Sequence, residues 1–324
     1  MLEKPERPGN IRYYRRLARK IVRRYFGTPA RRIVYRPSGL TNYVFAINHM
    51  DGQFVIRISP DSERLDAFRK EWWATQHVRT AGVPSPEILA VGNEIGPEPY
   101  MITRRVSGAE ATHHPKRTRI IHEMGRFAAI INSIKTNGFG TNFDWNPDTP
   151  AIATWSEYLD KEYRVAERLE FFTTHKILAE SEVNKLSEII EQTKTAEITP
   201  ALNHSDLRLK NLIVDEDDGE ITAIIDWEEC VSTVAPQWEL SIALHDLSID
   251  EKHAFIDGYG LRPEQVQQMA PLIKAFNLLN YHGAVAAAIE KNDEQTLAGI
   301  KMRLNGTLDL FSLAVSSGRR SHHV

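Results

Sequence analysis

The chain has 324 residues, of which 42% are hydrophobic and 26% charged, and its formal net charge is −3. This composition is that of a globular protein long enough for two buried cores, and it excludes a disordered or low-complexity chain. Its single cysteine, Cys230, cannot form an internal disulfide. No apolar run reaches about eighteen residues and residues 1–5 lack the apolar stretch of a secretory signal, so we expect a cytoplasmic protein without stable membrane insertion.

Basic residues are concentrated near the N-terminus. Between residues 12 and 36 there are ten Arg or Lys and no acid, and residues 11–22 have the pattern of a basic amphipathic helix. One interpretation is contact with acidic lipid, nucleic acid or an acidic partner. The other is a helix that packs Leu17, Ile21 and Tyr25 on a small domain and exposes its charges. Nothing downstream supports a nucleic-acid role, so we expect no nucleic-acid partner.

Residues 1–106 are predicted to form a small domain of antiparallel strands with one long helix. Asp51-Gly52, between two apolar stretches, is a strong hairpin signal. The predicted elements are two or three strands within 33–58, including 43–47 and 53–58, a helix over 62–81, and extended segments over 84–91 and 99–106.

A polar turn, Ser38-Gly39-Leu40-Thr41-Asn42, lies between the first two predicted strands. Backbone N–H groups and small hydroxyls in such a turn can cover the phosphates of a nucleotide. Ser38, Thr41 and Asn42 are the candidate contacts. A Ser-Gly turn can also do no more than reverse the chain.

After Ser107-Gly108 the pattern becomes helical, which predicts a second domain over residues 107–324. The predicted helices cover 116–135, 153–171, 178–195, 236–247, 251–258, 263–290 and 293–316. No internal repeat is evident.

The segment from His204 to Asn211 has the spacing H-x-D-x-x-x-x-N of a phosphoryl-transfer loop. Two short apolar strands around a turn at 217–219 follow it and end at Asp226, which we expect to fold back beside Asn211. An attacking hydroxyl needs a carboxylate base, for which Asp206 is the candidate. Mg²⁺ prefers oxygen ligands, which Asn211 and Asp226 supply, whereas His204 is expected to brace the loop. The alternative is a surface hairpin with a stray acid.

These motifs resemble the aminoglycoside phosphotransferase and choline kinase superfamily, and within it hygromycin B phosphotransferase-like enzymes. The likeness covers about residues 33–290. The resemblance implies an α+β, two-lobed protein-kinase-like fold with a small antiparallel-sheet lobe and a mostly helical large lobe. It also implies transfer of the γ-phosphoryl group of ATP, or alternatively GTP, with Mg²⁺ to a substrate hydroxyl. Other matching segments are 54–58, 83–87, 104–108, 138–140 and 154–155.

The resemblance also implies roles for residues of the small domain. Arg57 lies where protein kinases carry a phosphate-binding lysine, and Glu71 is its expected partner, with Glu63 as the alternative. A plain surface ion pair is the other interpretation. The carbonyl of Arg104 and the amide of Val106 are the expected adenine contacts. Each of these assignments depends on the register of one strand or helix.

Arg208 lies two residues after the candidate base, where a protein-kinase lysine reaches the γ-phosphate. It is expected either to neutralise charge on the transferred group or to form a salt bridge with a neighbouring helix. Many relatives carry histidine at this position, so the sequence departs from the family pattern here.

The acceptor is the least determined part of the prediction. Glu228 and Glu229 follow the metal-site Asp226 and are the candidate substrate contacts, whereas the acids over 157–170 alternate with basic residues, as on a solvated helix face. The expected acceptors are a hydroxyl-bearing aminoglycoside or aminocyclitol antibiotic, which would imply antibiotic resistance, or a metabolite such as choline, homoserine or a sugar. A non-catalytic nucleotide-binding scaffold is the alternative class, and the protein is expected to be a monomer or homodimer.

Overall fold

In the computed structural model, residues 10–37 and 42–306 are described, and the chain divides into two compact units. Unit 1 comprises residues up to Ala109 together with Ile213–Asp215 and Thr222–Glu228, and the remainder forms unit 2. Unit 1 contains an antiparallel sheet and unit 2 is mostly helical, which confirms the predicted α+β class. No helix within the described ranges is both long and apolar enough to span a membrane.

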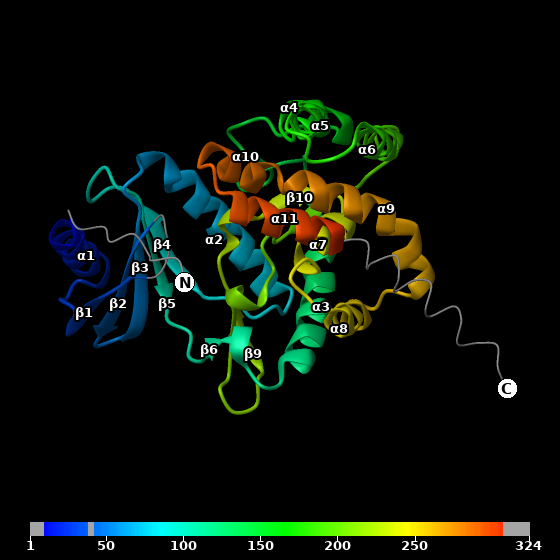
Figure 1. Ribbon diagram of the computed structural model, residues 1–324. Helices are drawn as coiled ribbons and strands as arrows, with labels where there is room; N and C mark the ends of the chain where they lie inside the picture. The colour runs from blue at the N-terminus through cyan, green and yellow to red at the C-terminus, as the bar shows by residue number, and fades with distance from the viewer. Residues whose placement is uncertain (1–9, 38–41, 307–324) are drawn as a thin grey trace. The chain divides into compact units, whose positions relative to one another are not determined.

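The sheet of unit 1 has five antiparallel strands in the order β1-β2-β3-β5-β4 (Figure 1). In the β2–β3 hairpin His49 pairs with Gly52, so Met50 and Asp51 form the turn, one residue earlier than predicted. Gly52 has φ +133°, a conformation that side chains of L-residues disfavour. The strands are β1 (Arg32–Arg36), β2 (Tyr43–His49), β3 (Gly52–Ile58), β4 (Ile88–Gly92) and β5 (Tyr100–Arg104).

Helix α1 (Ile11–Phe26) covers one face of this sheet. Leu17 and Ile21 are buried against strand side chains, as the packing interpretation predicted, but Tyr25 is 43% exposed and that part of the prediction was wrong. The helix is capped by Gly27, whose left-handed backbone lets its N–H bond to the carbonyl of Arg23. The apolar stripe of the basic helix is therefore used inside unit 1.

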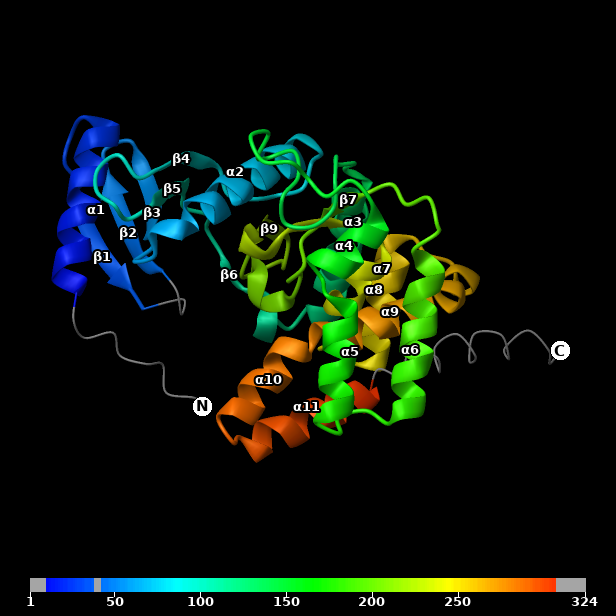
Figure 2. The ribbon, with the colours of Figure 1, turned by 90° about the horizontal axis from the view of Figure 1, so that it is seen from above.

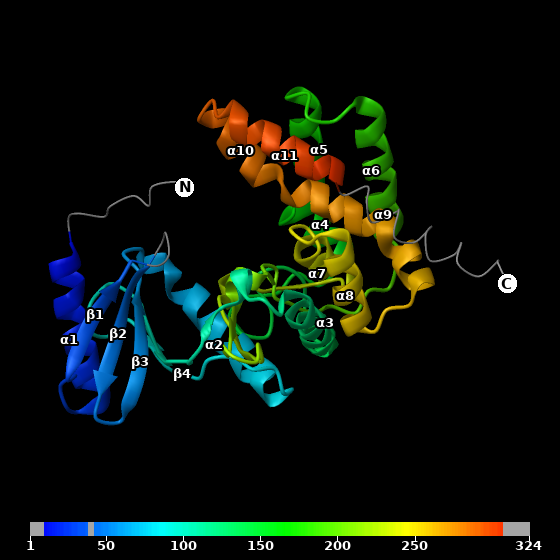
Figure 3. The same cartoon turned by 60° about the horizontal axis from the view of Figure 1, so that its bottom comes forward.

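Helix α2 (Leu65–Thr80) lies on the opposite face of the sheet from α1 (Figure 3). Phe68 of α2 packs with Ile88 of β4 and Met101 of β5 in a small apolar cluster. This packing fixes the helix over β4 and β5, next to the strand β3 that carries Arg57.

Unit 2 is built from helices, of which α5, α6 and α9 pack together around an apolar core (Figure 2). Two predicted helices are each divided in two: Arg164, with φ +52°, separates α4 from α5, and a tightened turn at Tyr281 separates α9 from α10. The helices are α3 (Arg117–Ser133), α4 (Trp155–Lys161), α5 (Val165–Thr174), α6 (Glu180–Thr193), α7 (Gln237–Ala243), α8 (Ile249–Tyr259), α9 (Pro263–Asn280), α10 (His282–Glu290) and α11 (Glu294–Gly306).

Two short sheets hold the segment around the predicted catalytic loop. Strand β7 (Ala201–Asn203) pairs with β10 (Val231–Thr233), and β6 (Ala109–Glu110), β8 (Leu212–Val214) and β9 (Ile221–Ile224) form a sheet in the order β6-β8-β9. Neighbouring strands β8 and β9 confirm the predicted hairpin, whose turn contains Gly219 at φ +75°.

Candidate active site

The loop that carries Asp206 leaves the buried strand β7 and is tied down at its first residues. His204 is fully buried, and its Nδ1 accepts a hydrogen bond from the backbone N–H of Asp206 at 3.3 Å, which agrees with its expected bracing role. Ser205 has φ +64°, a strained conformation for a residue with a side chain. Trp238 supports this residue by donating from Nε1 to the Ser205 hydroxyl at 3.0 Å.

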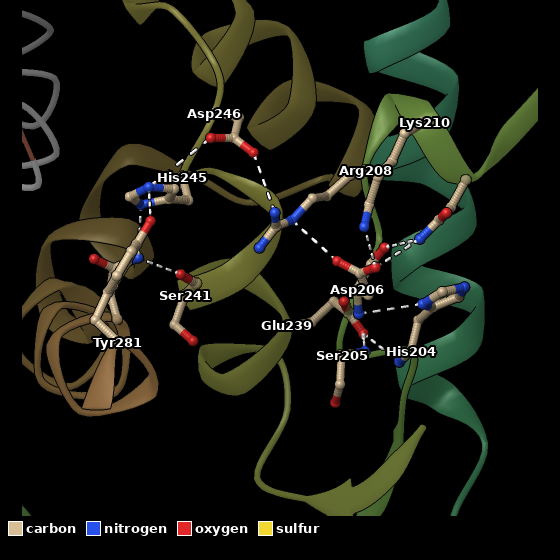
Figure 4. Close-up of polar contacts among 12 residues, drawn as sticks. His204, Ser205, Asp206, Arg208, Lys210, Glu239, Ser241, His245, Asp246 and Tyr281 are labelled. Carbon is tan, nitrogen blue, oxygen red and sulfur yellow. Dashed lines mark hydrogen bonds and ion pairs between the residues drawn. The ribbon is translucent and has the colours of Figure 1, made fainter. Parts of the chain in front are cut away.

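Glu239 of α7 anchors the same loop, and the sequence analysis did not identify this residue. Its Oε2 accepts hydrogen bonds from the backbone N–H groups of His204 at 2.5 Å and Ser205 at 3.4 Å (Figure 4). The side chain is fully buried, and among the described residues Oε1 has no hydrogen-bond partner. Burial raises the pKa of Glu239 to about 7, although the two backbone N–H groups oppose the shift. An acid within the apolar run 238–240 is the signal that could have identified it.

The carboxylate of Asp206 is held by three side chains of its own loop (Figure 4). Arg208 Nε lies 3.1 Å from Oδ1, and Lys210 Nζ lies 2.8 Å from Oδ2. Asn211 Nδ2 donates to Oδ2 and to the backbone carbonyl of Asp206, both at 2.8 Å. Oδ2 therefore accepts a hydrogen bond from Asn211 and lies at ion-pair distance from Lys210, whereas Oδ1 has only the ion-pair contact with Arg208, whose Nε makes no hydrogen bond among the described residues. A lone pair of Oδ1 is thus the better placed to accept a proton.

Asn211 is buried and its amide orientation follows from its partners. Because both of its contacts on Asp206 are acceptors, the NH₂ group must face them and the amide oxygen points elsewhere. That oxygen is the atom able to bind a cation, as the sequence predicted for this residue.

Arg208 also reaches a second acid that the sequence analysis missed. Its Nη1 lies 3.4 Å from Oδ2 of Asp246, which follows α7. This is the salt bridge considered for Arg208, and a role towards phosphate stays a prediction. The side chain of the neighbouring His245 is only 4% exposed and contacts the hydroxyl of Tyr281, and Asn277 Nδ2 lies 3.3 Å from its Nδ1.

In unit 1, Arg57 of β3 forms an ion pair with Glu71 of α2, as predicted. Only 17% of the Arg57 side chain and 7% of the Glu71 side chain are exposed, so the surface-pair interpretation was wrong. Burial alone would lower the pKa of Arg57, but the Glu71 carboxylate outweighs it and raises that pKa. The guanidinium carbon also lies 5.4 Å from the centre of the Phe68 ring. Glu63, the alternative partner, is exposed in the turn before α2.

Asp226 also belongs to unit 1 and follows β9 in a left-handed conformation, φ +68°. Its Oδ1 lies 3.9 Å from Arg57 Nη1. The strand before it is fixed by Ser85, whose hydroxyl donates to the carbonyl of Ile224 at 3.0 Å, and by the fully buried Trp227. Asn211 lies in unit 2, so the expected closeness of Asn211 and Asp226 stays a prediction.

The two acids predicted to contact substrate lie in different surroundings. Glu228 is partly buried in unit 1 with its Oε2 3.4 Å from Arg64 Nη1, and burial followed by repulsion from Asp226 raises its pKa. Glu229 is exposed and belongs to unit 2. Their roles towards the substrate stay predictions.

The remaining predicted nucleotide contacts are only partly described. Ser38 and Thr41 lie outside the described residues, whereas Asn42 is buried and its Oδ1 has no hydrogen-bond partner among them. Arg104 ends β5, and its exposed side chain pairs with Glu87 at 2.8 Å. Val106 is half-buried after that strand. Their roles towards adenine and phosphate stay predictions.

A comparison with known protein families shows which family the chain belongs to. Residues 32–272 match the phosphotransferase enzyme family, APH. The chain belongs to this family. The match includes the Asp206 loop, Asp226 and the Arg57–Glu71 pair.

Individual relatives of this phosphotransferase are distant. The chain is 23% identical to hygromycin-B 4-O-kinase of Escherichia coli over 200 residues, which cover 55% of this chain and 52% of the relative. It is 25% identical to acyl-CoA dehydrogenase family member 10 of Mus musculus over 207 residues, 59% of this chain and 18% of the relative. The chain thus spans about half of the first relative and a smaller part of the second.

Solved structures show the same kinase-like α+β fold. Aminoglycoside phosphotransferase APH(4)-Ia matches with a TM-score of 0.67 and 17% identity, over 91% of this chain and 99% of that one. The GDP complex of aminoglycoside 2′-phosphotransferase-IIIa matches with a TM-score of 0.61 and 15% identity, over 95% and 98%. At these identities the likeness concerns the fold alone.

The buried pair of this phosphotransferase gives a first prediction. We expect Arg57→Lys to lower the free energy of unfolding by about 1–2 kcal/mol, because lysine keeps the charge but loses the guanidinium geometry beside Glu71. Arg104→Lys is the matched control, since its pair with Glu87 is exposed and should change stability by less than about 0.5 kcal/mol. Urea unfolding measures both, and equal losses would contradict the prediction.

Proposed function

We propose that this protein is a kinase that transfers the γ-phosphoryl group of ATP to a hydroxyl of a small molecule. The observation that carries the proposal is the Asp206 loop, where Asn211 donates to the carboxylate and the buried side chains of His204 and Glu239 hold the backbone. A base fixed in this way does not have to reorganise when the hydroxyl arrives.

Asp206 is the proposed base, and Oδ1 is the proposed proton acceptor. As the hydroxyl oxygen forms its bond to the γ-phosphorus, its proton passes to Oδ1, and the bond between the γ-phosphorus and the bridging oxygen breaks to leave ADP. Arg208, 3.1 Å from Oδ1, is placed to stabilise negative charge beside this atom. Arg57, held by Glu71, is proposed to bind phosphate oxygens.

Asn211 and Asp226 are the proposed ligands of Mg²⁺. Their donor atoms fit a hard cation, since the amide oxygen of Asn211 faces away from Asp206 and the carboxylate of Asp226 is 39% exposed. When bound, the cation neutralises charge on the phosphates. No group of three or more His, Cys, Asp or Glu able to hold a metal occurs in the described part of the chain, so these two donors would need phosphate and water oxygens beside them.

The known complexes of structural relatives support a nucleotide and a hydroxyl-bearing acceptor. Aminoglycoside phosphotransferase APH(4)-Ia has been crystallised with AMP-PNP and hygromycin B, and APH(2″)-IIIa with GDP and kanamycin. We therefore propose ATP, with GTP as the alternative donor. The candidate acceptors are aminoglycoside or aminocyclitol antibiotics and metabolites such as choline, homoserine or sugars.

Phosphorylation assays with and without Mg²⁺ test the proposal. We expect ADP formation with at least one hydroxyl acceptor, with a gain of one phosphoryl group in its mass, and loss of both signals when EDTA removes the metal. A protein that binds ATP but turns over no acceptor, with or without Mg²⁺, would instead be a nucleotide-binding scaffold.

A further inference from the structure

Most acids over residues 157–170, which could face a polycationic acceptor, have polar partners within unit 2. Four acids of the segment 157–167 have such partners, two of them within the segment and two in other parts of unit 2. The pairs are Glu157 with Lys161 at 2.5 Å, Asp160 with Lys194 at 2.8 Å, Glu167 with Arg164 at 3.1 Å, and Glu162 with the backbone N–H of Thr141 at 2.8 Å.

Cations, by contrast, surround the proposed base. Arg208 contacts one oxygen of Asp206 and Lys210 the other, so two positive charges face one carboxylate. Asp246 balances the excess charge, but its ion pair with Arg208 is 3.4 Å long and its side chain is 41% exposed. An exposed pair of this geometry is weak and can be replaced by a better anion.

A series of contacts leads from Arg208 to further basic residues of unit 2. Asp246 follows His245, which contacts Tyr281, and the next residue is His282. Burial lowers the pKa of His282, and the positive charges of Arg168 and Arg164 lower it further. Arg164 and Arg168 thus place positive charge near His282, partly offset by Glu167.

We propose that the acceptor of this kinase carries an anionic group, a carboxylate or a phosphate, which binds the guanidinium of Arg208 in place of Asp246. This inference rests on the proposed function and specifies its substrate class. A guanidinium binds a carboxylate or phosphate through two parallel hydrogen bonds, which fixes the orientation of the ligand. Because Arg208 also touches Oδ1 of Asp206, an acceptor bound there presents its nearby hydroxyl to the proposed base.

A set of matched acceptors tests the proposal on the chain of 324 residues. Gluconate and glucose 6-phosphate are compared with neutral glucose, with cationic glucosamine, and with hygromycin B and kanamycin, by ADP release and by mass. We expect kcat/KM to be about tenfold or more higher for the two anionic sugars than for glucose. A higher value for glucosamine or for either antibiotic, or equal values throughout, overturns the inference and leaves the proposed function intact. Absence of transfer to every acceptor would overturn both.

Two variants test whether Arg208 is the residue that binds the anionic group. In Arg208→Gln the preference for anionic over neutral sugar should disappear, whereas Arg126→Gln, an exposed arginine that pairs with Glu123 on α3, should keep it. In Asp246→Asn the competing carboxylate is removed, so KM for the anionic sugars should fall severalfold while KM for glucose changes little. If Arg208→Gln abolishes all turnover, Asp246→Asn alone decides: an unchanged KM for gluconate would refute the role of Arg208 as the anion site.

Discussion

Asp206→Asn is expected to reduce kcat for phosphoryl transfer by about 10²- to 10⁴-fold, the usual contribution of a general base. Asparagine has nearly the same shape and can still accept a hydrogen bond, but it cannot take the proton of the attacking hydroxyl. The variant also leaves Arg208 and Lys210 without the charge that holds them at 3.1 and 2.8 Å. We therefore expect the loss to appear in kcat, with nucleotide affinity retained.

Glu220→Gln, an exposed acid of the β8–β9 turn, is the matched control and should retain wild-type kcat. Isothermal titration calorimetry with a non-hydrolysable nucleotide separates binding from chemistry. An Asp206→Asn protein with wild-type kcat would rule out Asp206 as the base.

The stability of the protein should depend on pH through Glu239. The pKa of this carboxyl rises from its ordinary value of 4.5 to about 7 in the folded protein, chiefly because it is buried. Below pH 4.5 both folded and unfolded chains carry the proton, so nothing is lost. As the pH rises towards 7 only the unfolded chain releases it, and the free energy of unfolding falls by about 3 kcal/mol in total before levelling off.

Glu239→Gln isolates this effect, because glutamine keeps an oxygen for the N–H groups of His204 and Ser205 but cannot ionise. The difference in unfolding free energy between variant and wild type should grow in favour of the variant from pH 5 to pH 7 and then stay constant. Glu239→Ala should instead lose about 3–5 kcal/mol, because it leaves a cavity and unpaired buried donors, and should lower kcat by loosening the loop. A pH-independent difference for the glutamine variant would show that Glu239 is ionised throughout this range.

The parts of the site that the sequence could predict depend on short-range pattern. The spacing from Asp206 to Asn211 places the amide against the carboxylate within one turn, and the turn before Gly219 returns β9 beside β8. The Arg57–Glu71 pair was also predictable, because a strand followed by its next helix leaves few acids within reach.

Other parts depend on contacts between distant segments, and a local pattern does not show which segment such a residue will meet. Glu239 meets the loop 35 residues earlier in the sequence, and Asp246 meets Arg208 only because α7 ends beside it. The break at Arg164 was missed because a left-handed arginine has no sequence signature. Local periodicity thus predicted which helices exist but not where each one is divided.

The division of the chain into units limits how the protein can be dissected. Ile213–Asp215 and Thr222–Glu228 are needed by unit 1 although they are encoded more than a hundred residues after Ala109. A gene fragment ending at that alanine would lack the peptide that carries Asp226 and the fully buried Trp227. Chimaeras made to exchange unit 1 between relatives must therefore transplant three separate stretches of coding sequence, and a single splice junction would produce an incomplete unit.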